Sequence, residues 1–145
     1  MRWGVAALTL LLTACWQGKP MGKEWTMESL MEYATATVTA KTPAEQIPCH
    51  PTTAEPFKAC FAIRGPVGQV STPLDQVFGE DLHQLGAWQF VGETGSVMYE
   101  TRAGQRLELG LTYSAKNEYS SFLEQLPEEA DGILFVVVDT SQFQN

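Results

Sequence analysis

The sequence predicts an α+β domain built on a five-stranded, mostly antiparallel sheet with helices packed on one face. Two windows, 27–38 and 74–85, repeat apolar residues every three or four positions, as amphipathic helices do. Three runs within 88–113 alternate apolar and polar residues, as half-buried strands do. The expected order of elements is α-β-α-β-β-β-α-β, in a single domain that spans 26–145.

The first helix is expected to follow Thr26, whose hydroxyl can accept a hydrogen bond from the first turn as an N-cap. Its apolar face consists of Met27, Leu30, Met31, Ala34 and Val38. A short third helix is expected to begin at Asn117 and to stop at Pro127, because proline cannot continue a helix.

The second helix is expected to begin with Thr72 as its N-cap and Pro73 at the first helical position. Proline is tolerated there because the backbone N–H of that position has no acceptor within the helix. Gly86 is expected to end this helix. His83 would then lie on the helix, at the edge of its apolar face.

The strands follow from shorter apolar patterns. Ala59–Ile63 predicts a short buried strand, and 88–113 predicts a three-stranded meander with glycine turns at Thr94-Gly95 and Ala103-Gly104. Ile133–Val138 is apolar at every position, which predicts a central strand that is buried on both faces. A return through a helix would allow this strand to lie parallel to one strand of the meander.

The amino-terminal residues have the pattern of a cleaved signal peptide. One positive charge, Arg2, precedes a run over 4–12 that is apolar apart from Thr9. A helix that spans a bilayer needs about 20 apolar residues, so this run is too short to stay in the membrane as an anchor. Its length fits the apolar region of a signal peptide.

Leu12-Thr13-Ala14-Cys15 stands at the end of this run. The segment 1–15 resembles the signal and lipobox of bacterial lipoproteins. The resemblance implies that 1–14 are removed, that Cys15 carries the lipid, and that 15–25 form a flexible tether in the cell envelope. Trp16 stands where aspartate would retain such a protein at the inner membrane, which implies the outer membrane, facing the periplasm, in a Gram-negative host. The alternatives are a soluble protein whose first strand or helix happens to be apolar, and a secreted product without lipid.

Two further cysteines, Cys49 and Cys60, are left over once Cys15 is assigned to lipid. In an oxidising envelope they are expected to form a disulfide. It would pin the loop Lys41–Lys58, which contains four prolines and no periodicity. Free thiols, or a metal site formed with His50, are the alternatives, although no zinc-site spacing is present.

The composition limits the classes of partner. The chain of 145 residues has 9 Lys and Arg against 17 Asp and Glu, a net charge of −8. Nucleic acid is therefore not an expected partner, because binding phosphates requires a basic surface. The lipid would attach the protein to a membrane, and the acidic domain would be free to meet another envelope protein.

No catalytic residues, metal ligands or cofactor are predicted. His50 lies in the proline-rich loop, and His83 has only Glu80 nearby at helical spacing. The acidic clusters Glu80-Asp81 and 128–131 lack the alternating oxygen ligands and glycine of a calcium loop, so we interpret them as solvated turns.

Four aromatic residues of the meander, Trp88, Phe90, Tyr99 and Tyr113, are the candidate binding surface. Alternation places side chains on two faces but does not say which face the helices cover. If the helices cover these residues, they form the core. If that face is open, it marks a partner site, because large exposed apolar patches are unusual on monomers.

The sequence therefore favours a lipid-anchored, non-enzymatic protein-binding module of inhibitor, immunity or assembly type. A basic enzyme would be attracted to such an acidic domain. One alternative is a carrier or sensor that holds a small molecule between helices and sheet, lined by Trp88, Tyr99 and Phe122. Another is an envelope hydrolase with two convergent carboxylates.

Replacing the lipid-bearing residue tests the anchor. Cys15→Ser is expected to leave the chain uncleaved or to release it from the membrane, because the acceptor of the lipid is lost. Intact mass of the envelope-extracted wild type is expected to show loss of 1–14 and addition of acyl chains. An unmodified wild-type product that starts at Met1 would contradict the anchor.

Overall fold

The computed structural model describes residues 22–50, 57–118 and 126–141. Within these ranges the chain forms two α-helices, one 3₁₀ turn and seven strands. The helices are α1 (Met27–Lys41) and α2 (Gly68–Asp81), and the 3₁₀ turn η1 is Lys116–Glu118. The strands are β1 (Ala44–Ile47), β2 (Lys58–Ile63), β3 (His83–Gln84), β4 (Gln89–Val91), β5 (Thr94–Glu100), β6 (Leu107–Ala115) and β7 (Gly132–Thr140).

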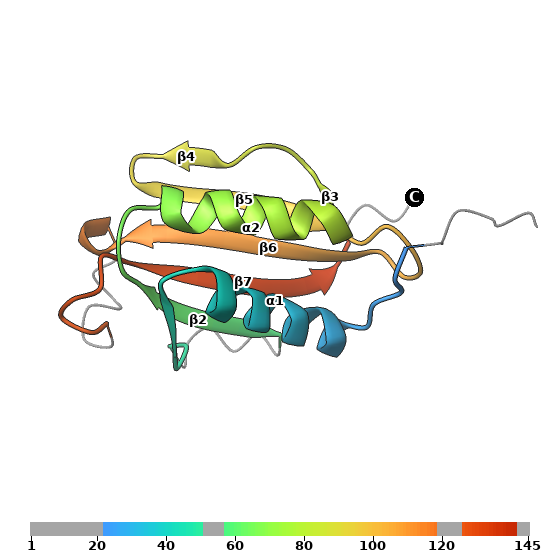
Figure 1. Ribbon diagram of the computed structural model, residues 1–145, viewed down its shortest axis with the longest axis horizontal. Helices are drawn as coiled ribbons and strands as arrows, with labels where there is room; N and C mark the ends of the chain where they lie inside the picture. The colour runs from blue at the N-terminus through green and yellow to red at the C-terminus, as the bar shows by residue number, and fades with distance from the viewer. Residues whose placement is uncertain (1–21, 51–56, 119–125, 142–145) are drawn as a thin grey trace, which may run out of the picture.

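All described strands join one sheet in which every pairing is antiparallel. The strand order is β1-β2-β7-β6-β5-β3, and β4 pairs with β5 on the same side as β3. Figure 1 shows α1 and α2 together on one face of the sheet. The predicted α+β class and the one-sided helix layer are thus confirmed, whereas the sheet has seven strands instead of five.

The strand β7 lies between β2 and β6, at the centre of the sheet. Ile133, Leu134, Phe135 and Val136 are all buried, so both faces of its first half are covered. The continuous apolar run therefore identified a central strand correctly. The parallel arrangement that the sequence left open is wrong, because β7 runs antiparallel to both neighbours.

The two strands that the sequence did not predict are the short ones. β1 lies in the expected loop Lys41–Lys58, and it pairs with β2 through Ala44 opposite Ile63 and Ile47 opposite Cys60. Its four residues show no alternation of apolar and polar side chains. β3 has only two residues. Strands of this length are defined by pairing with a longer neighbour, which leaves no periodic signal in the sequence.

The helix α2 differs from its prediction at both ends. It begins at Gly68, so Thr72 is not the N-cap and Pro73 lies inside the helix. It ends at Asp81, because Arg102 Nη2 donates 2.9 Å hydrogen bonds to the carbonyl oxygens of Gly79 and Leu82. These bonds satisfy acceptors that a longer helix would have paired internally.

The amino-terminal side of the domain begins earlier than the sequence predicts. Thr26 caps α1 as expected, since its hydroxyl accepts from Ser29 N at 3.1 Å and Ser29 Oγ accepts from Thr26 N at 2.9 Å. Trp25, expected in the tether, is buried in the core. Glu24 forms a parallel bridge with Ala103, so the fold includes both residues.

Several predictions lie outside the described residues. Residues 1–21 contain the expected signal sequence, Cys15 and most of the expected tether, and residues 119–125 contain most of the expected third helix, including Phe122. Of that helix, Asn117 and Glu118 lie in the 3₁₀ turn η1, and Leu126, which is also described, is not helical. Among the helices that the structure describes, none has the length and apolarity to cross a membrane.

The sheet packs against apolar residues on both faces. The main core lies between the sheet and the helices, and its largest fully buried side chains include Tyr99, Phe61 and Phe78. On the opposite face, Cys49 and Cys60 form the predicted disulfide, with Cα atoms 5.3 Å apart. This bridge belongs to a second cluster with Ile47, Ala62, Leu126, Ala130, Ile133 and Phe135. The second cluster covers only the part of that face formed by β1, β2 and the start of β7.

Removing the disulfide is expected to weaken the fold without changing it. The chain-entropy model assigns about 3 kcal/mol to closing a loop of this size, so Cys49→Ala/Cys60→Ala should unfold at lower urea concentration. Reductant should lower the wild-type midpoint similarly and leave the double variant unchanged. A wild-type midpoint that does not respond to reductant would contradict the bridge.

Candidate functional site

Two of the four candidate aromatic residues belong to the core. Tyr99 on β5 and Tyr113 on β6 have exposed fractions of 0% and 5%. Both lie in the helix-side cluster, because β5 and β6 turn these positions toward α1 and α2. The candidate surface of Trp88, Phe90, Tyr99 and Tyr113 is therefore not an open aromatic face.

Trp88 and Phe90 lie at the rim of the same face. Their rings stack with centroids 6.1 Å apart, and Trp88 packs partly buried against the core. The Phe90 ring covers Gly95 of the neighbouring strand so closely that a Cβ at Gly95 would collide with it. The aromatic side chain thus fills the space above a glycine. Phe90 is 48% exposed and is the one residue of the four with a large accessible surface.

Asp75 ties this rim to α2. Its Oδ1 accepts a hydrogen bond from Trp88 Nε1 at 2.9 Å and another from Tyr99 Oη. Burial, and then the hydrogen bond and charge of Asp75, raise the pKa of Tyr99 above its usual value. The Tyr99 hydroxyl therefore stays protonated and donates a hydrogen bond to Asp75, which is a structural role.

The acidic clusters that the sequence singled out are engaged in structural contacts. Asp81 Oδ2 accepts a 2.6 Å hydrogen bond from Tyr33 Oη, which joins α2 to α1. Asp131 Oδ2 accepts from Gly65 N at 2.5 Å, and Glu129 pairs with Arg64 at 2.9 Å. These bonds fasten loops and helices at the ends of the sheet.

The face of the sheet opposite the helices is open over β5, β6 and the second half of β7. Leu85 and Met98 are neighbours here, since Leu85 N donates to Met98 O at 2.9 Å, and they are 44% and 41% exposed. Val137 on β7 is partly exposed. Gly110 on β6 lies between the strands of Met98 and Val137 and has no side chain to fill the space.

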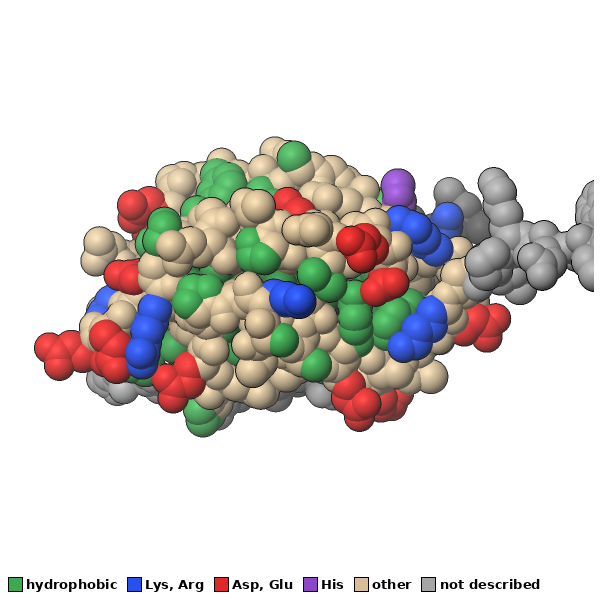
Figure 2. Space-filling model, in the orientation of Figure 1, with side chains coloured by type: hydrophobic (Ala, Val, Ile, Leu, Met, Phe, Trp, Pro, Cys, Tyr) green, Lys and Arg blue, Asp and Glu red, His purple; other side chains and the backbone are tan. Residues whose placement is uncertain are grey.

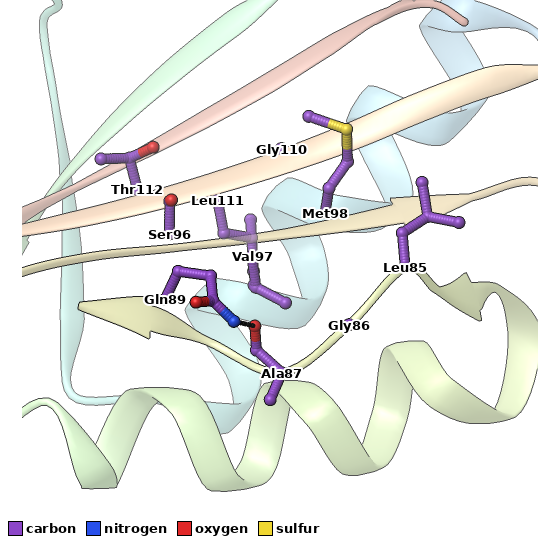
Figure 3. Close-up of a pocket in the computed structure, with 10 residues that line it drawn as sticks. All are labelled: Leu85, Gly86, Ala87, Gln89, Ser96, Val97, Met98, Gly110, Leu111 and Thr112. Carbon is purple, nitrogen blue, oxygen red and sulfur yellow. Dashed lines mark hydrogen bonds between the residues drawn. The ribbon is translucent and has the colours of Figure 1, made fainter. Parts of the chain in front are cut away.

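These residues surround two adjoining hollows, which together we call the open-face groove. One has a volume of about 350 Å³ and includes Leu85, Gln89, Ser96, Met98, Gly110 and Thr112 in its lining. The other, of about 260 Å³, is lined by Met98, Glu108, Gly110, Thr112, Val137 and Asp139. Figure 3 shows Ser96, Met98 and Thr112 on the open side of the sheet, while Val97 points toward α2. Both hollows are shallow and open to solvent.

A row of carboxylates closes one end of the groove. Strand pairing places Glu100 opposite Glu108, and Glu108 opposite Asp139. Glu100 pairs with Arg106 at 3.1 Å, and the buried Glu108 accepts from Ser141 Oγ at 2.9 Å, while Asp139 is exposed. Like charges opposite one another on neighbouring strands weaken a sheet, so a cation beside this acidic row would be stabilised.

The structure describes both histidines. His83 lies in β3 opposite Glu100, and not on α2 as the sequence predicted. His50 is the last described residue before the 51–56 segment. In the part of the chain that the structure describes, no three His, Cys, Asp or Glu residues are placed to hold a metal ion.

Sequence reasoning missed the groove. Met98 lies between the core residues Val97 and Tyr99, and Gly110 lies within the longest strand of the meander. The alternation does assign Met98 and Gly110 to one face, opposite Tyr99. It could not show that this face is the uncovered one, because the helix layer is a tertiary feature. No family model, curated protein or solved structure matches this chain.

The buried tyrosine predicts a loss of stability in alkali. Unfolded tyrosine has a pKa of about 10, and the folded pKa of Tyr99 is higher. The unfolded chain therefore loses this proton first as the pH rises, so this contribution is present below about pH 10 and is lost above it. Urea unfolding at several pH values should show a shallower decline for Tyr99→Phe than for wild type. Parallel curves would contradict the assignment.

Proposed function

We propose that this chain is a lipid-anchored protein of a bacterial envelope that binds another envelope protein through the open-face groove. The observation that carries the proposal is the groove itself, where Leu85 and Met98 are exposed beside an acidic row. The lipid attachment at Cys15 is inferred from the signal pattern of 1–15.

The anchor would keep the domain close to the bilayer. Six residues, 16–21, separate Cys15 from Gly22, where the described domain begins, and so short a segment spans at most about 25 Å. The partner we propose is therefore itself in or near the membrane. With Trp16 after the cysteine, we place the protein on the periplasmic side of the outer membrane in a Gram-negative host.

The groove has the features of a protein-binding surface. Its rim is apolar at Leu85, Met98 and Val137, and its floor at Ser96 and Gly110 is formed by small residues. A protruding apolar side chain of a partner would fill the hollow over Gly110 and bury the Met98 side chain. Binding energy concentrates in such pockets, around which polar residues exclude water.

The charge of the groove favours a basic partner. The acidic row stands beside the hollow that Met98 and Val137 line, so a lysine or arginine next to the inserted apolar side chain would reach it. The net charge of −8 would also raise the rate of encounter with a basic protein. This chemistry is compatible with an inhibitor or immunity-type role, which remains a prediction.

The other two candidate functions have less support. The fully buried Tyr99 and Phe78 occupy the region between helices and sheet where a carrier would hold its ligand. A hydrolase needs two convergent carboxylates, and Glu108 and Asp139 do share one hollow. Glu108, however, is buried and hydrogen-bonded to Ser141, as expected for a residue with a structural contact.

A photoreactive amino acid at Met98 tests the groove in intact envelopes. We expect one specific cross-linked product from position 98 and none from Ala36, an exposed position on α1. Asp139→Lys should remove that product, because it reverses a charge of the acidic row. The same products from both positions would contradict a binding groove.

Once the partner is isolated, Met98→Glu is expected to weaken binding about tenfold, because it places a charge in an apolar contact. Ala36→Glu makes the same change of charge on the helix side and is expected to leave affinity unchanged. Titration calorimetry measures both. Equal affinities for wild type and Met98→Glu would exclude the groove as the contact surface.

A further inference from the structure

The two edges of the sheet differ in their protection. The edge at β1 is flanked by Pro43 and Pro48, which have no backbone donor, and its Glu45 forms an ion pair with Arg64 at 3.6 Å. Prolines and charges are the usual means by which proteins prevent edge strands from pairing with other chains. The edge at β1 is therefore protected against pairing with another chain.

Among the described residues, the strands of the opposite edge, β3 and β4, contain neither proline nor Lys, Arg, Asp or Glu. The segment 82–92 contains no Lys, Arg, Asp, Glu or Pro, in a chain of which 18% is charged. All three residues of β4 are exposed, with Phe90 at 48% and Val91 at 84%. Of the large hydrophobic residues that are exposed in the described ranges, Leu85, Phe90 and Val91 lie in this segment.

The backbone of β4 is also oriented for pairing. Val91 and Thr94 pair across the two-residue turn Gly92-Glu93, in which Gly92 has a φ of 61°. In such a hairpin the closing pair exchanges its hydrogen bonds, and the next pair, Phe90 with Gly95, does not. The N–H and C=O of Phe90 therefore point away from β5, toward the free side of the edge.

We propose that the β4 edge, Gln89–Val91, pairs antiparallel with the β4 edge of a second copy of this chain. A two-fold axis through Phe90 would place the two Phe90 residues opposite each other, with two backbone hydrogen bonds between them, and each Gln89 opposite Val91 of the other copy. Aromatic pairs opposite one another stabilise adjacent strands.

The charge pattern permits a second copy as the occupant. Two chains of net charge −8 repel each other, and this repulsion is smallest where the contact surface itself has no carboxylates. Figure 2 shows acidic side chains at both ends of the helix-covered face, whereas the rim above α2, where Figure 1 places β4, is tan and green. The uncharged segment 82–92 provides such a surface.

The dimer has a consequence for the groove. Antiparallel pairing about an axis perpendicular to the sheet keeps both helix layers on one side and both open faces on the other. The two open-face grooves would form one continuous surface with two binding sites. A contact between two three-residue strands is short and needs a high local concentration of the chain. The inference therefore rests on the proposed anchor, because two chains attached to one bilayer have a high effective concentration.

Cysteine cross-linking in envelope membranes tests the register. Opposed positions have Cα atoms about 4.5–5.5 Å apart, within the range of a disulfide. Oxidation of Phe90→Cys is expected to give a covalent dimer, and so is oxidation of Gln89→Cys/Val91→Cys, which leaves the Phe90 ring in place. Leu85→Cys, at a similarly exposed position off the axis, is expected to give none. The proposal would be overturned if Leu85→Cys formed dimers as fast as Phe90→Cys, or if neither β4 variant formed them.

The wild type separates this inference from the anchor. Its Cys49 and Cys60 are paired, so a cross-linked wild-type dimer would report a free Cys15 thiol and overturn the lipid anchor. In that case the cross-linking of the β4 variants is measured in the Cys15→Ser background, where residue 15 has no thiol. In detergent, Phe90→Lys is expected to raise the dimer dissociation constant about tenfold relative to Ala36→Lys, because like charges face each other across the axis. Equal constants, measured by light scattering, would overturn the edge contact.

Discussion

The helix layer covers one face of a seven-stranded sheet, and the rest of the structure follows from this constraint. On the helix face, Tyr99 and Phe78 fill the core, and Asp75 fastens α2 to the sheet through Tyr99 and Trp88. The helices do not cover the opposite face of the sheet. The disulfide cluster covers part of it, and the remainder, over β5, β6 and the second half of β7, is the open-face groove.

Exposed apolar surface of this kind has a cost in water unless a partner covers it. The molecule exposes such surface in two places with different chemistry. The groove combines the side chains of Leu85 and Met98 with an acidic row, which suits a basic protein. The β4 edge combines free backbone groups with uncharged side chains, which suits another copy of the same chain. The β4 edge lies at the opposite side of the sheet from β1, and the groove extends from that side over β5 and β6 to the second half of β7.

Long periodic segments were predicted well and short paired ones were not. The helix after Thr26, the strands of the meander and the central strand from Ile133 were identified because each buries a continuous pattern of side chains. The first turn of the meander was misplaced: Thr94 and Gly95 lie in β5, and the turn is Gly92-Glu93. β1 and β3 were missed because pairing with β2 and β5 creates them. The carboxyl end of α2 was wrong because Arg102, distant in sequence, donates hydrogen bonds to the carbonyl oxygens of Gly79 and Leu82 in place of a local signal. Its amino end was wrong because the helix begins at Gly68 without a side-chain cap, before the Thr72-Pro73 signal.

The sequence by itself determined the α+β class and the two sets of side chains on each meander strand, because these depend on local periodicity. It predicted the pairing of Cys49 with Cys60 only after the signal pattern had assigned Cys15 to lipid. It also contains the signal pattern at Cys15 that the proposed anchor rests on. Only the tertiary structure decided which set faces water: it placed Tyr99 and Tyr113 under the helices and left Met98 and Gly110 open. The physical reason is that a β-strand presents both faces equally, and only packing against the helices makes one of them the inside.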